Sequence, residues 1–125
     1  MSARAAKAPW VVYTYSSCDT CRKATRWLRE HGHAFEERPI RDTPPAPVEL
    51  ARALRSVEGD RGRLFNRSGR DYRDQGLAEL LPGWSDAEVI KRLAANGNLV
   101  KRPLLLGDRV VLIGFDEQAW SAALG

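Results

Sequence analysis

The stretch Tyr13-Thr14-Tyr15-Ser16-Ser17-Cys18-Asp19-Thr20-Cys21-Arg22-Lys23 holds both cysteines of this 125-residue chain, separated only by one Asp-Thr pair. The β-branched and aromatic run from Trp10 to Tyr15 predicts a strand that is central in its sheet and buried on both faces. A helical pattern follows from Arg22 to Glu30, because apolar residues recur there on one face. The two cysteines therefore fall at a turn from a strand into a helix.

The middle of the chain predicts a less buried strand and then a helical insertion. Residues 34–40 form the strand, which carries several charged side chains. Pro47 suits the first turn of a helix that runs to about Ser56, and residues 57–76 predict short helices and loops. Ser85 and Glu88 form a capping box for a later helix that stops at Asn96-Gly97. The insertion therefore covers about residues 47–97.

The last part of the chain predicts a β-hairpin and a final helix. Pro103 begins the first strand of the hairpin, Gly107-Asp108 forms its turn, and residues 109–113 form the second strand. Asp116 caps a helix over 117–124. The element order is thus β-α-β, several helices, and β-β-α. A right-handed crossover plus a hairpin gives an α/β fold with a four-stranded mixed sheet, which is the thioredoxin-like plan with a helical insertion between its halves.

Length and composition indicate a single globular domain over residues 10–125. Hydrophobic residues make up 43% and charged residues 29% of the chain, as in ordinary globular proteins. No run approaches the roughly 18 apolar residues of a membrane span. Residues 1–9 lack the apolar core of a secretory signal, so we expect a disordered tail there and a cytoplasmic protein. Without a coiled-coil seam or a long apolar patch, we expect a monomer.

The net charge of +4 favours anionic partners, namely oxyanions, phosphates or nucleic acid. The alternative is a solvated, arginine-rich surface. In the cytosol thiols stay reduced, so a close cysteine pair is more often catalytic or metal-binding than structural.

Cys18 is the predicted nucleophile. It precedes a helix whose dipole and free N–H groups favour a thiolate, and Arg22 and Arg102 add positive charge. Cys21, about one turn further on, is the predicted resolving thiol. The alternatives are an inert buried pair or a zinc site. Zinc needs two more ligands, and the only histidines lie a helix away, so we expect no metal.

Ser17 lies immediately before Cys18 and has two possible roles. With the N–H groups of residues 18–21, its hydroxyl forms an anion cradle. Alternatively, Ser17 simply caps the helix.

A series of short motifs follows in order from about residue 10 to residue 120: Tyr15 to Ala24, Arg41 to Pro45 before Glu49-Leu50, Leu64 to Arg73, Ile90 to Arg92, Lys101 to Leu105, and Val111 to Phe115. In these motifs the chain resembles the arsenate reductase (ArsC), Spx and MgsR family of thioredoxin-fold proteins. The resemblance implies a cis Pro103 that brings Arg102 toward Cys18, where Arg102 holds an oxyanion by paired hydrogen bonds. The alternative is a trans Pro103 beside a solvated Arg102.

The chain departs from the family in its arginines. The family's arsenate reductases typically place three arginines around one cysteine, and this chain has Asn66 and Gly114 at the first and third aligned positions. We expect the oxyanion to be held by Ser17, Arg22, Arg67, Arg102 and Pro103. Arg63, Arg70 and Arg109 are further candidates to replace the missing arginines.

The resemblance implies three alternative functions. The expected one is a thiol-dependent reductase of arsenate in arsenic detoxification, with no bound cofactor and an external reductant, either glutathione with glutaredoxin or thioredoxin. The second is an Spx-like regulator, in which a dithiol switches binding to RNA polymerase. The third is a glutathione- or thioredoxin-linked thiol–disulfide reductase without arsenate activity.

Overall fold

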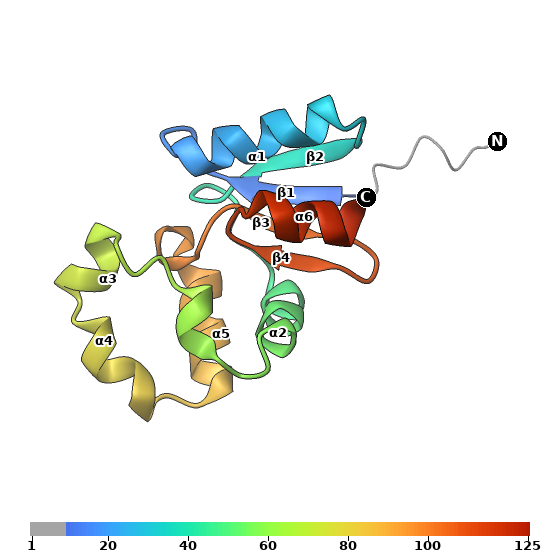
Figure 1. Cartoon of the computed structure of the whole chain (residues 1–125). Coiled ribbons are helices and arrows are strands. Elements are labelled where there is room, and N and C mark those ends of the chain that lie inside the picture. Colours follow the sequence, from blue (N-terminus) through green and yellow to red (C-terminus); the bar gives the residue numbers. More distant parts are fainter. Residues whose placement is uncertain (1–9) are drawn as a thin grey trace.

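The computed structural model describes residues 10–125 (Figure 1), so the tail expected at residues 1–9 lies outside the described part. Thirteen elements follow one another, with η marking 3-10 helices: β1 (Trp10–Thr14), α1 (Asp19–Glu30), β2 (Phe35–Pro39), α2 (Pro47–Ser56), η2 (Arg61–Leu64), α3 (Arg70–Asp74), α4 (Leu77–Leu80), η3 (Leu81–Gly83), α5 (Asp86–Ala95), η4 (Gly97–Leu99), β3 (Leu104–Leu106), β4 (Val111–Ile113) and α6 (Glu117–Leu124). The described residues include no helix with the length and apolar character needed to cross a membrane.

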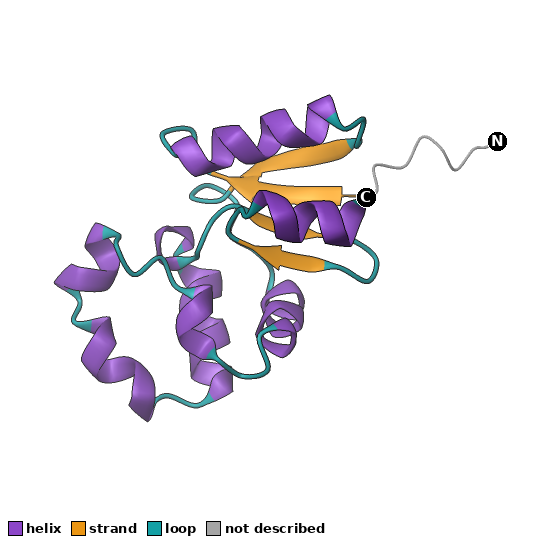
Figure 2. Ribbon diagram, in the orientation of Figure 1, coloured by secondary structure: helices purple, strands orange, loops and turns teal. Residues whose placement is uncertain are grey.

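The four strands form one mixed sheet in the order β2-β1-β3-β4 (Figure 2). β1 runs parallel to β2 and antiparallel to β3, and β3 and β4 form an antiparallel hairpin. The central place of β1 and the lower burial of β2 are as predicted, and the lower burial of β2 follows from its place at the edge of the sheet. The helical elements from α2 to η4 lie between the two halves in sequence, so the thioredoxin-like α/β plan with its insertion is confirmed.

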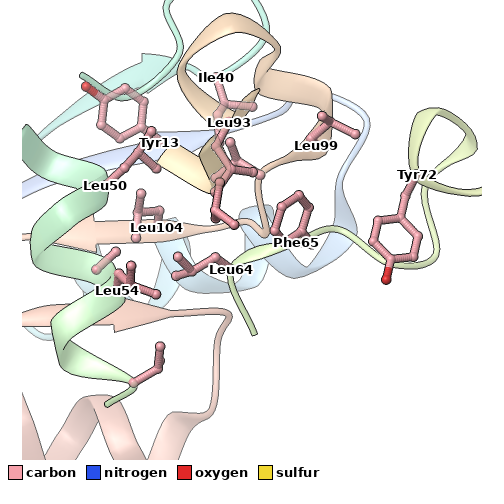
Figure 3. Close-up of a cluster of buried hydrophobic side chains, with 14 of the residues drawn as sticks. Tyr13, Ile40, Leu50, Leu54, Leu64, Phe65, Tyr72, Leu93, Leu99 and Leu104 are labelled. Carbon is pink, nitrogen blue, oxygen red and sulfur yellow. The ribbon is translucent and has the colours of Figure 1, made fainter. Parts of the chain in front are cut away.

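Side chains that alternate along the strands fill two cores, one on each face of the sheet. On one face, Val12 and Leu105 pack with the buried residues of α1 and α6, among them Trp27 and Trp120. On the other face, Tyr13 and Leu104 pack against the insertion, whose buried side chains include Leu50, Leu54, Phe65 and Leu93 (Figure 3). The sheet is therefore covered on both faces, and the strand ends remain available for a site.

Several local predictions were wrong. The helix after the cysteines begins at Asp19 rather than Arg22, because Cys18 itself is the N-cap residue. The second hairpin strand begins at Val111 rather than Arg109, since the hairpin needs a four-residue loop whose Gly107 N–H donates to the Val110 carbonyl at 2.8 Å.

The predicted capping box is only half formed. Ser85 accepts the Glu88 N–H at 3.1 Å, but the Glu88 carboxylate pairs with Arg92 one turn further along α5. The first strand is also less enclosed than predicted, because Trp10 and Val11 are half-buried. The buried part of the strand is Val12 to Thr14, which leads into the cysteine turn.

Candidate active site

Cys18 occupies the N-cap position of α1. Its backbone is extended, with φ −109° and ψ 110°, and its Sγ accepts the Cys21 N–H at 3.2 Å. The Cys18 N–H donates to the Tyr15 carbonyl at 3.1 Å, which fixes the turn out of β1. A sulfur thus fills the role that a Ser or Asp oxygen usually has at a helix start. The capping role considered for Ser17 belongs to Cys18, and Ser17 is exposed.

The two cysteines are free thiols in different environments. Cys18 is half-buried, whereas Cys21 is only 2% exposed. Burial raises the pKa of the Cys21 thiol to about 12, and its hydrogen bond with Cys18 acts in the same direction, while the Tyr15 backbone and the charge of Arg102 oppose the rise. At neutral pH Cys21 therefore keeps its proton. This leaves Cys18, at the positive end of the α1 dipole, as the sulfur that an external electrophile meets first.

Arg102 lies close to the same turn. Its peptide bond to Pro103 is cis, as the resemblance implied. The Arg102 guanidinium is 5.1 Å from the centroid of the Tyr15 ring, and the Arg41 guanidinium is 5.0 Å from it. Arg41 also donates to the Tyr15 hydroxyl at 2.7 Å, and Arg102 donates to the Asn98 carbonyl at 3.3 Å. One aromatic ring thus holds two cations where β1 leads into the cysteine turn.

These two arginines line a hollow of about 330 Å³, which we call the Arg102 hollow. Its lining residues are Tyr15, Arg41, Asn66, Gly69, Arg70, Asp71, Asn98 and Arg102. Three arginines face one carboxylate there, so the lining carries excess positive charge. Such a hollow favours an anion, and the guanidiniums offer paired N–H donors to it.

Asp71, the one carboxylate of that lining, is held by amides. Asn96 and Asn98 donate to its Oδ2 at 3.0 Å and 3.3 Å. These hydrogen bonds, with Arg41 and Arg70 nearby, keep the pKa of the Asp71 carboxyl below its ordinary value. Asp71 is therefore ionised at neutral pH and fixes η4 and α3 against each other at the base of the site.

The structure does not gather all the predicted oxyanion ligands. Arg22 forms an ion pair with Asp19 and donates to the Ser16 carbonyl at 2.7 Å, so it braces the first turn of α1. Arg67 lines a different hollow, together with Arg63 and Lys101. Pro103 is buried directly before β3. Of the predicted set, the Arg102 hollow contains Arg102 alone.

Sequence reasoning gave no role to Arg41 and kept Arg70 only as an alternative. A signal for Arg41 was present, because it follows the second strand of a β-α-β unit. Parallel strands bring their carboxyl ends to the same edge of the sheet, so Arg41 and the Cys18 turn had to be close.

The histidines lie elsewhere. The rings of His31 and His33 stack on Trp27, with centroid distances of 4.1 Å and 5.7 Å. Within residues 10–125, no group of three His, Cys, Asp or Glu side chains is placed to hold a metal ion.

Comparisons with known proteins give a consistent picture. Residues 13–123 match the ArsC family. YusI of Bacillus subtilis is 43% identical over 106 residues, covering 84% of this chain and 89% of the relative. The global transcriptional regulator Spx of Streptococcus agalactiae is 32% identical over 108 residues, covering 86% and 77%. The crystal structure of a possible arsenate reductase from Streptococcus mutans superposes with a TM-score of 0.84 at 30% identity, covering 92% and 99%.

Proposed function

Since the chain belongs to the ArsC family, we propose that it is a cytoplasmic thiol-dependent reductase that converts arsenate to arsenite. The observation that carries the proposal is the position of the Cys18 sulfur. It caps α1 and accepts the Cys21 N–H at 3.2 Å, while Tyr15 links its turn to the arginine-lined hollow. A nucleophile and an anion-binding lining thus share one turn of the chain.

The first step is attack by the Cys18 thiolate on arsenic. A sulfur–arsenic bond forms, an arsenic–oxygen bond breaks, and the oxygen leaves as water after it takes up protons. Arg102, with Arg41 and Arg70 beside it, balances the negative charge of the arsenate oxygens. The N–H groups at the start of α1 stabilise the sulfur before attack.

In the second step Cys21 resolves the adduct. Cys21 loses its proton and attacks the Cys18 sulfur, so a disulfide forms and the sulfur–arsenic bond breaks. The bonding pair stays on arsenic, which leaves as arsenite, and the two electrons gained by arsenic equal the two lost by the thiols. An external reductant, glutathione with glutaredoxin or thioredoxin, then restores the dithiol. Burial raises the pKa of Cys21, so this thiol stays protonated in the resting protein, where Cys18 is the attacking sulfur.

The test couples arsenate reduction to NADPH oxidation through a thioredoxin system and, separately, a glutaredoxin system. We expect arsenate-dependent turnover with one of them and none with Cys18→Ser. Ser16→Ala is the matched control, because Ser16 is exposed in the same turn and only its carbonyl receives a side-chain hydrogen bond, from Arg22. Absence of turnover in both systems, or equal turnover in Cys18→Ser, contradicts the proposal.

The second candidate is a redox-switched regulator. The similarity to Spx and the Cys18–Cys21 pair support it. A pull-down with the C-terminal domain of the RNA polymerase α-subunit, using oxidised and reduced protein, tests it. Binding that changes with oxidation state supports the regulator, and no binding in either state removes it.

The third candidate, a thiol–disulfide reductase without arsenate activity, rests on the same cysteine pair. Replacing arsenate by a small disulfide in the coupled assay separates it from the proposed reaction. Turnover of the disulfide without turnover of arsenate would favour this third function.

A further inference from the structure

A second basic hollow lies beside the Phe65–Val100 bridge. The segments around these two residues run antiparallel, with the Asn66 N–H donating to the Leu99 carbonyl and the Lys101 N–H donating to the Leu64 carbonyl, each at 2.8 Å. The bridge therefore holds residues 64–66 and 99–101 side by side.

Neighbouring residues of these two segments line two different hollows. Asn66 and Arg102 line the Arg102 hollow. Their chain neighbours Arg67 and Lys101, with Phe65, line a separate hollow of about 410 Å³. Arg63, Ser68 and Ile113 complete it, and we call it the Lys101 hollow. The catalytic proposal above uses none of these residues.

The Lys101 hollow has an unbalanced charge. Arg63, Arg67 and Lys101 are exposed, and no carboxylate lines the hollow with them. The ion pairs formed within residues 10–125 involve none of the three. Three positive charges around one concave surface repel each other, and a bound anion removes that repulsion.

The Lys101 side chain passes close to Gly114. The glycine at 114 has φ +74°, and a Cβ there would lie 3.5 Å from Lys101 Cε. The aliphatic part of Lys101 therefore lies along the Gly114 backbone while its ammonium group reaches solvent.

We propose that the Lys101 hollow binds a doubly charged tetrahedral oxyanion, either inorganic phosphate or a phosphomonoester, independently of Cys18. The two guanidiniums supply paired N–H donors, the ammonium supplies a compact charge, and the Ser68 hydroxyl supplies a further donor. A dianion with several acceptor oxygens uses these donors together, whereas a carboxylate leaves part of them unused. Ile113 adds a half-buried apolar wall, which matches the organic group of a phosphomonoester.

The experiment titrates the ¹⁵N-labelled full chain at constant ionic strength, with amide shifts as the readout. The probes are inorganic phosphate, phenyl phosphate and acetate. We expect saturable shifts at residues 63–68, 101 and 113–114 with both phosphates, tighter binding of phenyl phosphate, and no saturation with acetate. Lys101→Gln and Arg67→Gln should each weaken phosphate binding about tenfold, as for loss of one charge-assisted hydrogen bond.

Matched controls separate a site from general surface charge. Lys23→Gln and Arg26→Gln remove exposed charges from α1 and should leave the phosphate affinity unchanged. Cys18→Ser should also leave it unchanged, so that failure of arsenate reduction and failure of this site are distinguishable. All variants alter exposed or half-buried residues, and a thermal melt verifies that each one folds.

Four results would overturn the proposal. They are shifts that do not saturate, shifts confined to residues of the Arg102 hollow, acetate binding as tightly as phosphate, and an unchanged affinity in both Lys101→Gln and Arg67→Gln.

Discussion

The Cys21 N–H donates to the Cys18 sulfur at 3.2 Å, so one cysteine caps the helix in which the other is buried. The cap and the resolving thiol therefore belong to one turn of α1. A reaction at Cys18 that removes its acceptor role also changes the environment of Cys21. The two sulfurs are therefore coupled within one helical turn but have different roles, with Cys18 as the cap and nucleophile and Cys21 as the buried resolving thiol.

Selective alkylation tests that division of tasks. Because burial raises the pKa of Cys21 to about 12, roughly one molecule in ten thousand carries the Cys21 thiolate at pH 8. We expect iodoacetamide to modify Cys18 at pH 8 and to leave Cys21 intact, as read by peptide mass spectrometry. Unfolded protein, in which both cysteines should react, is the positive control. Comparable modification of the two in the folded chain would contradict this prediction.

Replacing Arg102 tests the anion lining. Arg102→Gln removes a cation from the hollow, so the KM for arsenate should rise about tenfold or more, as expected for about 1.5–3 kcal/mol from a charge-assisted hydrogen bond. Arg92→Gln is the matched control, since Arg92 also lies over an aromatic ring, 4.7 Å from the Trp84 centroid, but on α5. Steady-state kinetics measure both, and an equal rise in the two variants would show that the effect is not specific to the site.

Gly97 permits a close approach of two backbones. A Cβ at this position would lie 1.8 Å from the Ile40 carbonyl oxygen, so Gly97→Ala should force η4 away from the end of β2. We expect a loss of about 1–3 kcal/mol in the free energy of unfolding, the usual range for overpacking, and weaker arsenate binding because Asn98 and Arg41 flank the contact.

Urea unfolding measures the loss of stability. Gly83→Ala is the control, because a Cβ at Gly83 meets nothing within 4 Å. Similar free energies of unfolding for the two variants would mean that the backbones at Gly97 and Ile40 can move apart without a large loss of stability, and would contradict the prediction.

Asp71 predicts a pH dependence of stability. Its pKa is lowered in the folded state, chiefly by the hydrogen bond from Asn96. Its ionised form therefore adds stability above the ordinary aspartate pKa of about 3.9, and that stability is lost as pH falls through the lower folded value. We expect Asp71→Asn to lower Tm at pH 7, and the difference from the parent protein to shrink as pH falls below about 3.9.

The control for this measurement is Asp74→Asn, an exposed aspartate on the same short helix. It should not change Tm at neutral or at acidic pH. A Tm difference for Asp71→Asn that does not shrink as pH falls below about 3.9 would contradict the assignment to its carboxylate.

The sequence was sufficient for the architecture because the hydrophobic pattern dictates it. The apolar residues of β1 and the charged residues of β2 indicate how deeply each strand is buried, and Gly107 marks the turn of the hairpin. The predicted ends of the helix and the hairpin were less accurate. A cysteine sulfur that caps a helix, as at Cys18, has no strong signal in the sequence, and neither has the four-residue loop of the hairpin.

The site was predicted less completely. Arg102 was found from its motif, whereas Arg41 enters the hollow only because β1 and β2 pair in parallel. Arg67 was expected beside Arg102, but it lies in the turn after Asn66 and lines the Lys101 hollow instead. That turn follows the bridge between Phe65 and Val100, a long-range contact that no local pattern encodes.

The bridge between Phe65 and Val100 holds the two hollows next to each other, because Asn66 and Arg67 are neighbours in one segment and Lys101 and Arg102 are neighbours in the other. A substitution that loosens this bridge would therefore disturb both hollows at once, whereas replacing one arginine disturbs only the hollow that this arginine lines.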